Sequence, residues 1–305
     1  MKHIYGVKNI KLLERSIVIL GNFDGIHIGH QKLCEMAKEV GDEKGFKTVL
    51  FSFYPHPTWI LGDKPTALLM TREEKADRVK QLGIDIYVEY PFSLEFGQKS
   101  AEDFVTGVLL DKLTCKAVII GDNYFFGNNQ EGNVAYMQKL GHKYDFEVFV
   151  VDEVKEGNKT VSSTLIRDLV LRGNIELANK LIGQPYMVKG VVVQGKQLGR
   201  TLGFPTVNLI PDANKVLPPN GVYITKTHIL GTVYDSLTNI GNNPTVNGTQ
   251  KMVETFIFDF CKDVYGEKIT VEIIKHVRPE TKFNSLVELT NQMNKDKSFA
   301  LDYIK

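Results

Sequence analysis

The chain has 305 residues, 43% of them hydrophobic, which is enough for one large core or two of ordinary size. Its 37 basic residues nearly balance its 36 acidic residues, so no strong overall field draws the molecule to nucleic acid or to an anionic membrane. The apolar runs are only as long as strands and residues 1–16 hold no continuous apolar stretch, so we expect a cytoplasmic globular protein without a membrane span.

The first part of the chain alternates short β-branched runs with longer amphipathic segments, which is typical of a parallel sheet wrapped by helices. Five strands are predicted, at residues 16–20, 47–53, 84–90, 116–121 and 147–154. Helices are predicted over 30–45 and 71–83, and the second begins with Thr71 and Glu74 in the spacing of a capping box. The pattern indicates an α/β domain.

After about residue 185 the pattern changes to short strands separated by Gly, Asn and Pro turns. Strands are predicted within residues 186–199, 220–230, 232–246, 252–260 and 267–279, which favours an antiparallel sheet or barrel. A helical segment ended by Gly183 and Pro185 separates the two parts. We therefore predict two domains, 1–183 and 184–305.

Three cysteines, Cys34, Cys115 and Cys261, lie far apart, and no two of them have CxxC spacing. Such spacing favours reduced thiols over disulfides or a zinc cage. We expect these cysteines to be packing residues.

Residues 16–33, SIVILGNFDGIHIGHQKL, run from a strand through a glycine turn into a helix. A helix N-terminus in this arrangement presents free N–H groups and a positive dipole end to a phosphate. Gly21, Gly25 and Gly29 allow close backbone approach, and His27 and His30 can donate hydrogen bonds to a triphosphate and to the charge that grows during its cleavage. Two alternatives are that the histidines are solvated cap residues or that they bind a metal, although no carboxylate is spaced to complete a metal site.

Eight motifs together resemble one family, the bacterial bifunctional riboflavin kinase/FAD synthetases (FMN adenylyltransferases). GNFDGIHIGH (21–30) resembles the HxGH signature of nucleotidyltransferases, with the FDG lead-in of this family. Three further segments resemble the other signatures of the FMN adenylyltransferase domain: FSFYPHP (51–57), GDNYFFG (121–127) and VSSTLIR (161–167). Four segments resemble those of the riboflavin kinase domain: GRTLGFPTVNL (199–209), PNGVY (219–223), NIGNNPT (239–245) and VETFIFDF (253–260). Their shared order across two domains makes coincidence a poor explanation.

The resemblance implies a Rossmann-like nucleotidyltransferase domain with a parallel sheet, followed by a riboflavin kinase-like antiparallel β-barrel. In the first domain it implies that His27, His30 and Arg167 are catalytic and act on the triphosphate. It implies nucleotide-binding roles for Gly21, Phe23, Asp24, Gly25, Gly29, Ser162, Ser163 and Thr164, and flavin-binding roles for His56, Asn123, Tyr124 and Phe126. The Ser-Ser-Thr run can equally be a plain helix cap, since capping and phosphate binding use the same amides. His56, between two prolines, can also be a structural loop residue.

In the second domain the resemblance implies that a glycine loop cradles ATP through Gly195, Lys196, Gly199 and Gly203, although the run lacks the GxxxxGK[ST] order of a Walker loop. It implies Thr206 and Asn208 as Mg²⁺ ligands, Asn239 as a flavin contact and Glu254 as the general base. From the residues alone, Thr206 and Asn208 can be polar residues of an edge strand, and alternation makes Glu254 a solvent-facing carboxylate.

The implied activity is that of a transferase in FAD biosynthesis. Riboflavin is phosphorylated by ATP to FMN, and FMN is adenylylated to FAD with release of pyrophosphate, both with Mg²⁺. The expected partners are these small-molecule substrates, without nucleic acid or membrane, for a monomer or weak homo-oligomer. Two alternatives remain: a monofunctional FAD synthetase whose barrel only binds flavin or nucleotide, and a flavin- or nucleotide-sensing regulator. The second is disfavoured by the intact sets of polar groups and the lack of a basic helix for reading DNA.

Overall fold

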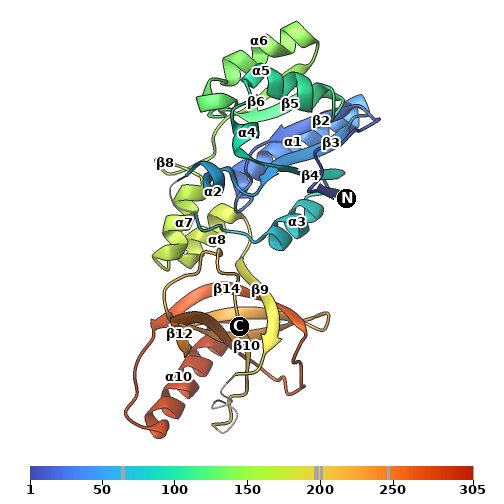
Figure 1. Cartoon of the computed structure of the whole chain (residues 1–305). Helices are drawn as coiled ribbons and strands as arrows, with labels where there is room; N and C mark the ends of the chain where they lie inside the picture. The colour runs from blue at the N-terminus through green and yellow to red at the C-terminus, as the bar shows by residue number, and fades with distance from the viewer. Residues whose placement is uncertain (63–65, 196–198, 200–201, 246–247, 305) are drawn as a thin grey trace. The chain divides into compact units, whose positions relative to one another are not determined.

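The computed structural model describes residues 1–62, 66–195, 199, 202–245 and 248–304, and side chains within 243–250 are outside the description. Lys196 therefore lies outside the described residues. Residue contacts divide the chain into two compact units, Met1–Ser163 and Thr164–Lys305 (Figure 1). The boundary expected after Gly183 stays a prediction.

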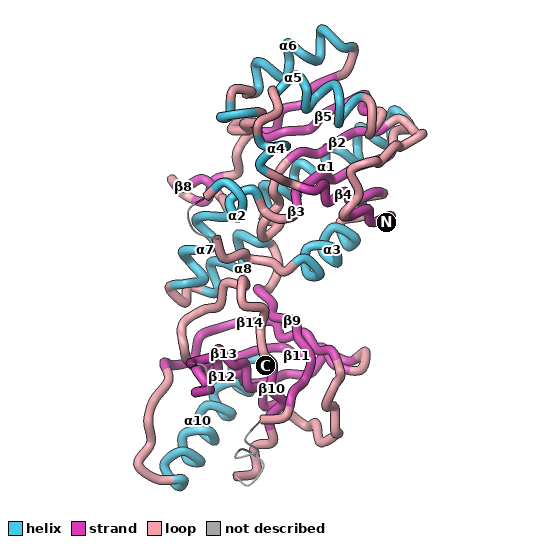
Figure 2. The backbone as a smooth tube through the Cα atoms, viewed as in Figure 1, coloured by secondary structure: helices cyan, strands magenta, loops and turns pink. Residues whose placement is uncertain are grey.

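The first unit is built on a six-stranded parallel sheet (Figures 1 and 2). Its order is β1-β4-β3-β2-β5-β6, formed by β1 (Lys2–Tyr5), β2 (Ser16–Leu20), β3 (Lys47–Tyr54), β4 (Ile86–Pro91), β5 (Cys115–Gly121) and β6 (Glu147–Val151). The prediction of a parallel sheet is confirmed, and the five predicted strands correspond to β2 to β6. Strand β1 was not predicted, because KHIY carries no β-branched run.

Helices cover both faces of this sheet. The helices of this unit are α1 (Ile28–Lys44), α2 (Pro57–Leu61), α3 (Arg72–Gln81), α4 (Leu94–Gly97), α5 (Ala101–Phe104), η1 (Val105–Leu110), η2 (Asn128–Gln130) and α6 (Val134–Tyr144), of which α1, α3, α5, η1 and α6 contribute buried residues to the cores on the sheet. Ile17 and Ile19 of β2 pack into the core that includes α1 and α3, whereas Val18 and Leu20 pack into the core that includes α5, η1 and α6. Burial on both faces explains why this strand is apolar at every position after Ser16. A small hairpin, β7 (Lys155–Glu156) with β8 (Lys159–Thr160), follows β6.

The strand order reverses at β2. Strands β3 and β4 lie on one side of it and β5 and β6 on the other. In open α/β sheets such a switch point leaves a crevice at the carboxyl ends of the strands, where ligands bind. The loop 21–27 between β2 and α1 starts from this point.

The second unit contains a closed antiparallel barrel with strand order β10-β13-β12-β11-β14-β9. Its strands are β9 (Tyr186–Val193), β10 (Thr206–Leu209), β11 (Gly221–Ile229), β12 (Thr232–Thr245), β13 (Gly248–Ile257) and β14 (Lys268–Pro279). The prediction of an antiparallel barrel is confirmed. Strand β10 pairs on both sides, with β13 and β9, so it is not the edge strand that the residues alone allowed.

Helices α7 (Ser163–Leu171), α8 (Ile175–Ile182) and α10 (Leu286–Ile304) accompany the barrel. Helix α8 is tied to the barrel by Asn179, which donates to the carbonyl of Ile273 at 2.9 Å and accepts from the N–H of Tyr186 at 2.7 Å. Helix α10 contributes Ala300 to a core that includes Ile224 and Leu237. None of the helices, over the described ranges, has both the length and the apolar character needed to cross a membrane.

The barrel interior contains a polar cluster among its apolar side chains. Fully buried hydroxyls are joined by hydrogen bonds of 2.8–2.9 Å between Thr225, Thr227, Ser236, Thr238 and Thr255. Because side chains alternate along a strand, Leu237 and Asn239 of β12 lie on the face opposite to Thr238. Leu237 packs with α10, so this opposite face is the outside of the barrel.

Candidate functional site

The loop after β2 places the histidine pair at the start of α1. His27 is the N-cap residue, with extended φ and ψ of −69° and 172°, and its Nδ1 accepts a hydrogen bond from the backbone N–H of His30 at 3.4 Å. An imidazole therefore does here what a Ser or Asp side chain usually does. Since Nδ1 accepts, the proton of the neutral ring is on Nε2 and can be donated to a ligand.

The two rings stack on each other, with centroids 3.7 Å apart and planes inclined by 20°. Burial lowers the pKa of His27 to about 4, against a weaker opposing effect of Asp24. Burial also holds the pKa of His30 well below its usual value, and the neighbouring His27 and Lys75 lower it further. Near neutral pH the pair is therefore uncharged and offers N–H groups rather than cations.

The histidine pair also leaves one buried hydrogen-bonding atom without a partner among the described residues. The Nδ1 atom of His30 is buried and has no hydrogen-bond partner among the described residues. A buried polar atom of this kind carries a desolvation cost unless a ligand or water meets it. The arrangement fits a site whose hydrogen bonds are completed by a bound anion.

The turn between strand and helix is strained. Phe23 and Ile26 have φ of 51° and 38°, in the left-handed region that side chains rarely adopt. Gly25 has φ of 82°, and a Cβ there would lie 2.8 Å from Cδ1 of Leu69, so only glycine fits. Phe23 is fully buried in the core with α1. A direct contact of Phe23 or of Gly21, Gly25 and Gly29 with nucleotide stays a prediction.

The structure gives Asp24 partners within the protein. Its side chain is 3% exposed, and its carboxylate accepts from the N–H groups of Leu69 at 2.8 Å and Met70 at 3.3 Å. Its carbonyl accepts from Oγ of Ser163 at 2.8 Å. These contacts hold Asp24 and Ser163 in place, whereas their predicted contacts with nucleotide are untested.

Two further predicted segments follow β3 and β5, the neighbours of β2 in the sheet. His56 caps α2, with Nδ1 2.8 Å from Oγ1 of Thr58. Asn123 donates from Nδ2 to Glu153 at 2.7 Å. Carboxyl ends of parallel strands share one edge, so both segments start from the edge that carries the histidine loop.

Tyr124 and Phe126 are stacked, with ring centroids 5.8 Å apart. Phe126 is buried in the same core as Phe104, at a centroid distance of 6.1 Å, and burial raises the pKa of Tyr124. Packing therefore accounts for Phe126, and the predicted flavin contacts of His56, Asn123, Tyr124 and Phe126 remain untested. Helix α7 begins at Ser163, so the Ser-Ser-Thr run lies at a helix start, while the roles of Ser162, Thr164 and Arg167 toward the triphosphate stay predictions.

In the barrel, strand register brings together residues that are far apart in the sequence. Asn208 of β10 is directly opposite Glu254 of β13, and Glu254 is directly opposite Asn239 of β12. Paired residues of antiparallel strands share one face, so these three form a row on the outer face of the barrel. Thr206, two residues before Asn208, lies on the same face. We call Asn208, Glu254 and Asn239 the polar row.

Of the predicted glycines, Gly195 packs directly against this face. A Cβ on Gly195 would collide with the side chain of Asn208, which is 5% exposed, and a Cβ on Gly199 would collide with the carbonyl of Phe204. Gly203 has φ of 82°. Gly195 and Gly199 are therefore needed for close approach and Gly203 for its positive φ, while the contact of these glycines with ATP stays a prediction.

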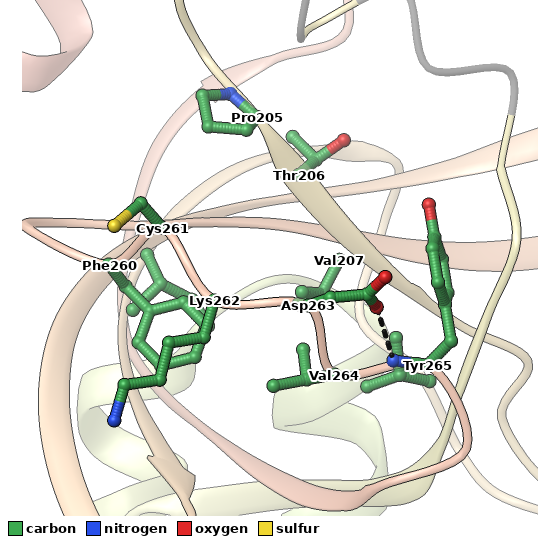
Figure 3. A pocket seen from close by; sticks show the side chains of 11 residues that line it. Pro205, Thr206, Val207, Phe260, Cys261, Lys262, Asp263, Val264 and Tyr265 are labelled. Carbon is green, nitrogen blue, oxygen red and sulfur yellow. Dashed lines mark hydrogen bonds between the residues drawn. The ribbon is translucent and has the colours of Figure 1, made fainter.

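Beside Thr206 the barrel has a cavity of about 210 Å³ (Figure 3). Its wall combines Val192, Pro205, Thr206, Val207 and Ile257 with the segment 260–265. Within that segment the N–H of Tyr265 donates to Oδ1 of Asp263 at 3.2 Å, the dashed line of Figure 3. Sequence reasoning missed residues 261–265, because they carry no motif and reach the cavity only through closure of the barrel. Cys261, expected to be a packing residue, is instead exposed here.

The barrel site offers oxygen atoms that could hold a metal ion. Across the described part of the chain, no three His, Cys, Asp or Glu side chains gather in a way that could hold a metal ion. The hydroxyl of Thr206 and the amide of Asn208 share one face, and an ion that keeps several waters needs few protein ligands. The chemistry of these two residues fits Mg²⁺, and their role as its ligands stays a prediction.

Comparison with known proteins identifies both units. A family model described as FAD synthetase matches residues 9–165, and one described as riboflavin kinase matches residues 182–304. A Bacillus subtilis protein is 37% identical over 95% of this chain and 92% of its own length. An Escherichia coli K12 protein is 34% identical over 99% of this chain and 98% of its own length. Both are named bifunctional riboflavin kinase/FMN adenylyltransferase.

A solved structure described as a macrolide-efflux protein from Streptococcus pneumoniae has a TM-score of 0.90 and 30% identity, covering 98% of this chain and 99% of that one. That description belongs to that protein, whereas the two family models and the curated relatives agree on two enzymatic domains. The relatives extend over nearly the whole chain, so the agreement includes both units. The chain belongs to the family of bifunctional riboflavin kinase/FMN adenylyltransferases.

Proposed function

We propose that this chain converts riboflavin to FMN at the polar row of the barrel, and FMN to FAD at the histidine pair of the first unit. The observation that carries the proposal is that each unit has its own polar site. One site consists of stacked neutral imidazoles at the carboxyl end of β2, and the other of a carboxylate between two amides on the barrel.

For adenylyl transfer, a phosphate oxygen of FMN attacks the α-phosphorus of ATP, the bond from that phosphorus to the bridging oxygen breaks, and pyrophosphate leaves. Nε2–H of His27 and the ring of His30 donate to the triphosphate oxygens as their negative charge grows. The N-terminus of α1 supports the same charge through its dipole. The sequence resemblance also assigns Arg167 to this reaction, since its permanent charge matches phosphate oxygens. No covalent intermediate with the protein is required.

For phosphoryl transfer, the 5′-hydroxyl of riboflavin attacks the γ-phosphorus of ATP, and Glu254 takes the hydroxyl proton. Asn208 and Asn239 flank Glu254 in the row, where their amides can orient the carboxylate and the substrate. Thr206 and Asn208 would hold Mg²⁺, which when bound offsets the charge of the phosphates. ADP leaves with the oxygen that bridged the β- and γ-phosphorus atoms.

The cavity beside Thr206 is a suitable place for the adenosine part of ATP. Its wall is mostly apolar, with Val192, Val207 and Ile257 among the lining residues, and it adds the polar groups of Lys262 and Asp263. Small-molecule sites commonly combine apolar walls with a few polar groups that fix orientation. A nucleoside held there leaves its phosphates near Thr206, which lines the cavity and also lies on the face of the polar row.

The test is to incubate the full chain with riboflavin, ATP and Mg²⁺ and to separate FMN from FAD by chromatography over time. We expect FMN to appear first and FAD after a lag, whereas FMN supplied directly gives FAD without a lag. FAD from FMN but no FMN from riboflavin would identify a monofunctional FAD synthetase. No product from either substrate would refute both assignments.

A further inference from the structure

The carboxylate of Asp24 joins two segments that are 45 residues apart in the sequence. Its Oδ1 accepts from the N–H groups of Leu69 at 2.8 Å and of Met70 at 3.3 Å, and its Oδ2 lies 3.1 Å from the N–H of Leu69. A buried carboxylate that accepts from backbone amides is strongly held, because charge-assisted hydrogen bonds are stronger than neutral ones. Asp24 therefore fixes the loop 21–27 to the segment before α3.

Two other contacts join the same pair of segments. Nζ of Lys75, in the first turn of α3, donates to the carbonyl of Asn22 at 2.7 Å. The side chain of Leu69 lies so close to Gly25 that a Cβ there would be 2.8 Å from its Cδ1. The loop that carries the histidines is thus held by hydrogen bonds through residues 22 and 24 and by close packing at residue 25.

The segment to which the loop is tied is itself well anchored. Nε of Arg72 donates to Oε2 of Glu89 at 2.5 Å, and Glu89 belongs to the buried part of β4. Thr71 and Glu74 form the predicted capping box at the start of α3, with Glu74 Oε2 accepting from the N–H of Thr71 at 2.8 Å. Through this segment, Asp24 connects the histidine loop to the sheet.

We propose that Asp24 is a positioning residue for FMN adenylylation, which holds the strained turn 23–26 and thereby the His27 cap in the conformation that meets the triphosphate. The turn includes Phe23 and Ile26 at positive φ, so it needs outside contacts to keep this shape. His27 follows Asp24 by three residues, and a shift of about 1 Å in a catalytic group can cost on the order of 10² in rate. This inference rests on the proposed function of the histidine pair.

The test compares Asp24→Ala and Asp24→Asn in the full chain. Alanine removes both accepting oxygens, and we expect the kcat of FAD formation to fall about 10²-fold with a smaller change in the KM for ATP. Asparagine keeps one accepting oxygen, so it should recover part of the loss and lower kcat by only about three- to tenfold. Riboflavin phosphorylation by the same molecules should stay within about twofold in both variants, because its residues lie in the other unit.

A matched control is Asn133→Ala, which removes the capping side chain of α6, a helix outside the segments that Asp24 joins. It should lower the melting temperature by roughly 2–4 °C without changing the kcat of FAD formation. If Asn133→Ala lowers kcat as much as Asp24→Asn does, general destabilisation explains the loss and the proposal is wrong.

Three other outcomes overturn the proposal. One is a kcat within about twofold of the parent in Asp24→Ala, and another is a rise in the KM for ATP with unchanged kcat, which identifies Asp24 as a nucleotide ligand. The third outcome applies if Asp24→Ala does not fold. In that case Asp24→Asn decides, and a kcat of Asp24→Asn within about twofold of the parent overturns the proposal. A His27 variant separates this proposal from the proposed function. If the histidine pair is not the site of FMN adenylylation, that variant forms FAD at the normal rate, whatever the Asp24 variants do.

Discussion

The two candidate sites are built in different ways. In the first unit, the histidine pair lies within ten consecutive residues, 21–30, at one turn between a strand and a helix. In the barrel, Asn208, Glu254 and Asn239 come from three strands and meet only through their register. A site of the first kind depends on local backbone geometry and a few anchoring contacts. A site of the second kind depends on the correct closure of the whole barrel.

The protonation states of the two sites also differ. Burial keeps His27 and His30 neutral, so the first site offers hydrogen-bond donors without fixed charge. The polar row has a carboxylate at its centre, between two amides. Donors are suited to an anion that gains charge during reaction, whereas a carboxylate is suited to accepting a proton from a hydroxyl. The following predictions test whether the sites act as separately as this contrast requires.

The largest expected effect is on the barrel site. Glu254→Gln keeps the size of the side chain but removes the proton acceptor, so riboflavin kinase turnover should fall by on the order of 10²–10⁴. FAD formation from supplied FMN should be unchanged. Asp259→Asn is the matched control, since Asp259 is an exposed carboxylate shortly after the end of β13. Near-normal kinase turnover of Glu254→Gln at saturating substrates would assign the base elsewhere.

The next effect is on the histidine pair. His27→Asn keeps an acceptor for the helix cap but removes the Nε2–H donor, so FAD formation from FMN should fall by on the order of 10²–10³. FMN formation from riboflavin should stay within about twofold. His142→Asn, at an exposed histidine near the end of α6, should change neither rate. Equal loss of both activities in His27→Asn, with an unchanged circular dichroism spectrum, would mean that the sites are not separate.

A smaller effect is expected for the proposed metal ligand. If Thr206 binds Mg²⁺, Thr206→Ala removes a hard oxygen ligand, and the KM of the kinase for ATP should rise about tenfold at low Mg²⁺. Raising the Mg²⁺ concentration should recover part of this loss, and Thr206→Ser, which keeps the hydroxyl, should behave like the parent. The Glu254→Gln defect should not respond to Mg²⁺. A Thr206→Ala loss that is independent of Mg²⁺ would exclude Thr206 as a ligand.

The smallest effect concerns stability. Burial lowers the pKa of His27 to about 4, so between the unfolded value near 6.5 and about 4 the unfolded chain binds a proton that the folded chain does not. The stability that the fold gains by holding His27 neutral is fully present above pH 6.5. As the pH falls toward 4, protonation of His27 in the unfolded chain lowers the free energy of unfolding by on the order of 3 kcal/mol.

The stability of the first unit can be followed separately, because the single tryptophan of the chain, Trp59, lies in that unit. Urea unfolding at pH 7, 6 and 5, read by Trp59 fluorescence without ligand, should show a steeper loss of stability for the parent than for His27→Asn. The difference between the two proteins removes the contribution of other titrating groups. Parallel curves would show that His27 is not held neutral by the fold.

The sequence predicted the parts of the structure that have a local pattern. β-branched runs gave β2 to β6, and the capping box at Thr71 and Glu74 gave the start of α3. Strand β1, KHIY, has only four residues with little apolar character, and it forms because it pairs with β4. Its existence depends on a partner more than 80 residues away, which no local pattern records.

The candidate sites show the same limit. The histidine loop was recognisable because strand, turn and helix are contiguous, but the buried contacts of Asp24 with Leu69 and Met70 were not, because the segment 66–70 carries no motif. The polar row could not be predicted from the sequence, because its residues meet only through the pairing of β10, β13 and β12. The cavity wall at 261–265 needed closure of the barrel, so it had no signal in the sequence.

The central claim is that the two reactions occur at separate sites and that FMN passes between them. The most direct measurement mixes equal amounts of His27→Asn and Glu254→Gln with riboflavin, ATP and Mg²⁺, and quantifies FAD against each variant alone. Neither variant alone should convert riboflavin to FAD efficiently, because His27→Asn stops at FMN and Glu254→Gln cannot make FMN. The mixture should form FAD, since FMN released by one molecule is a substrate for the other. A mixture that forms no more FAD than the two variants separately, although each retains its own half-reaction, would contradict the account.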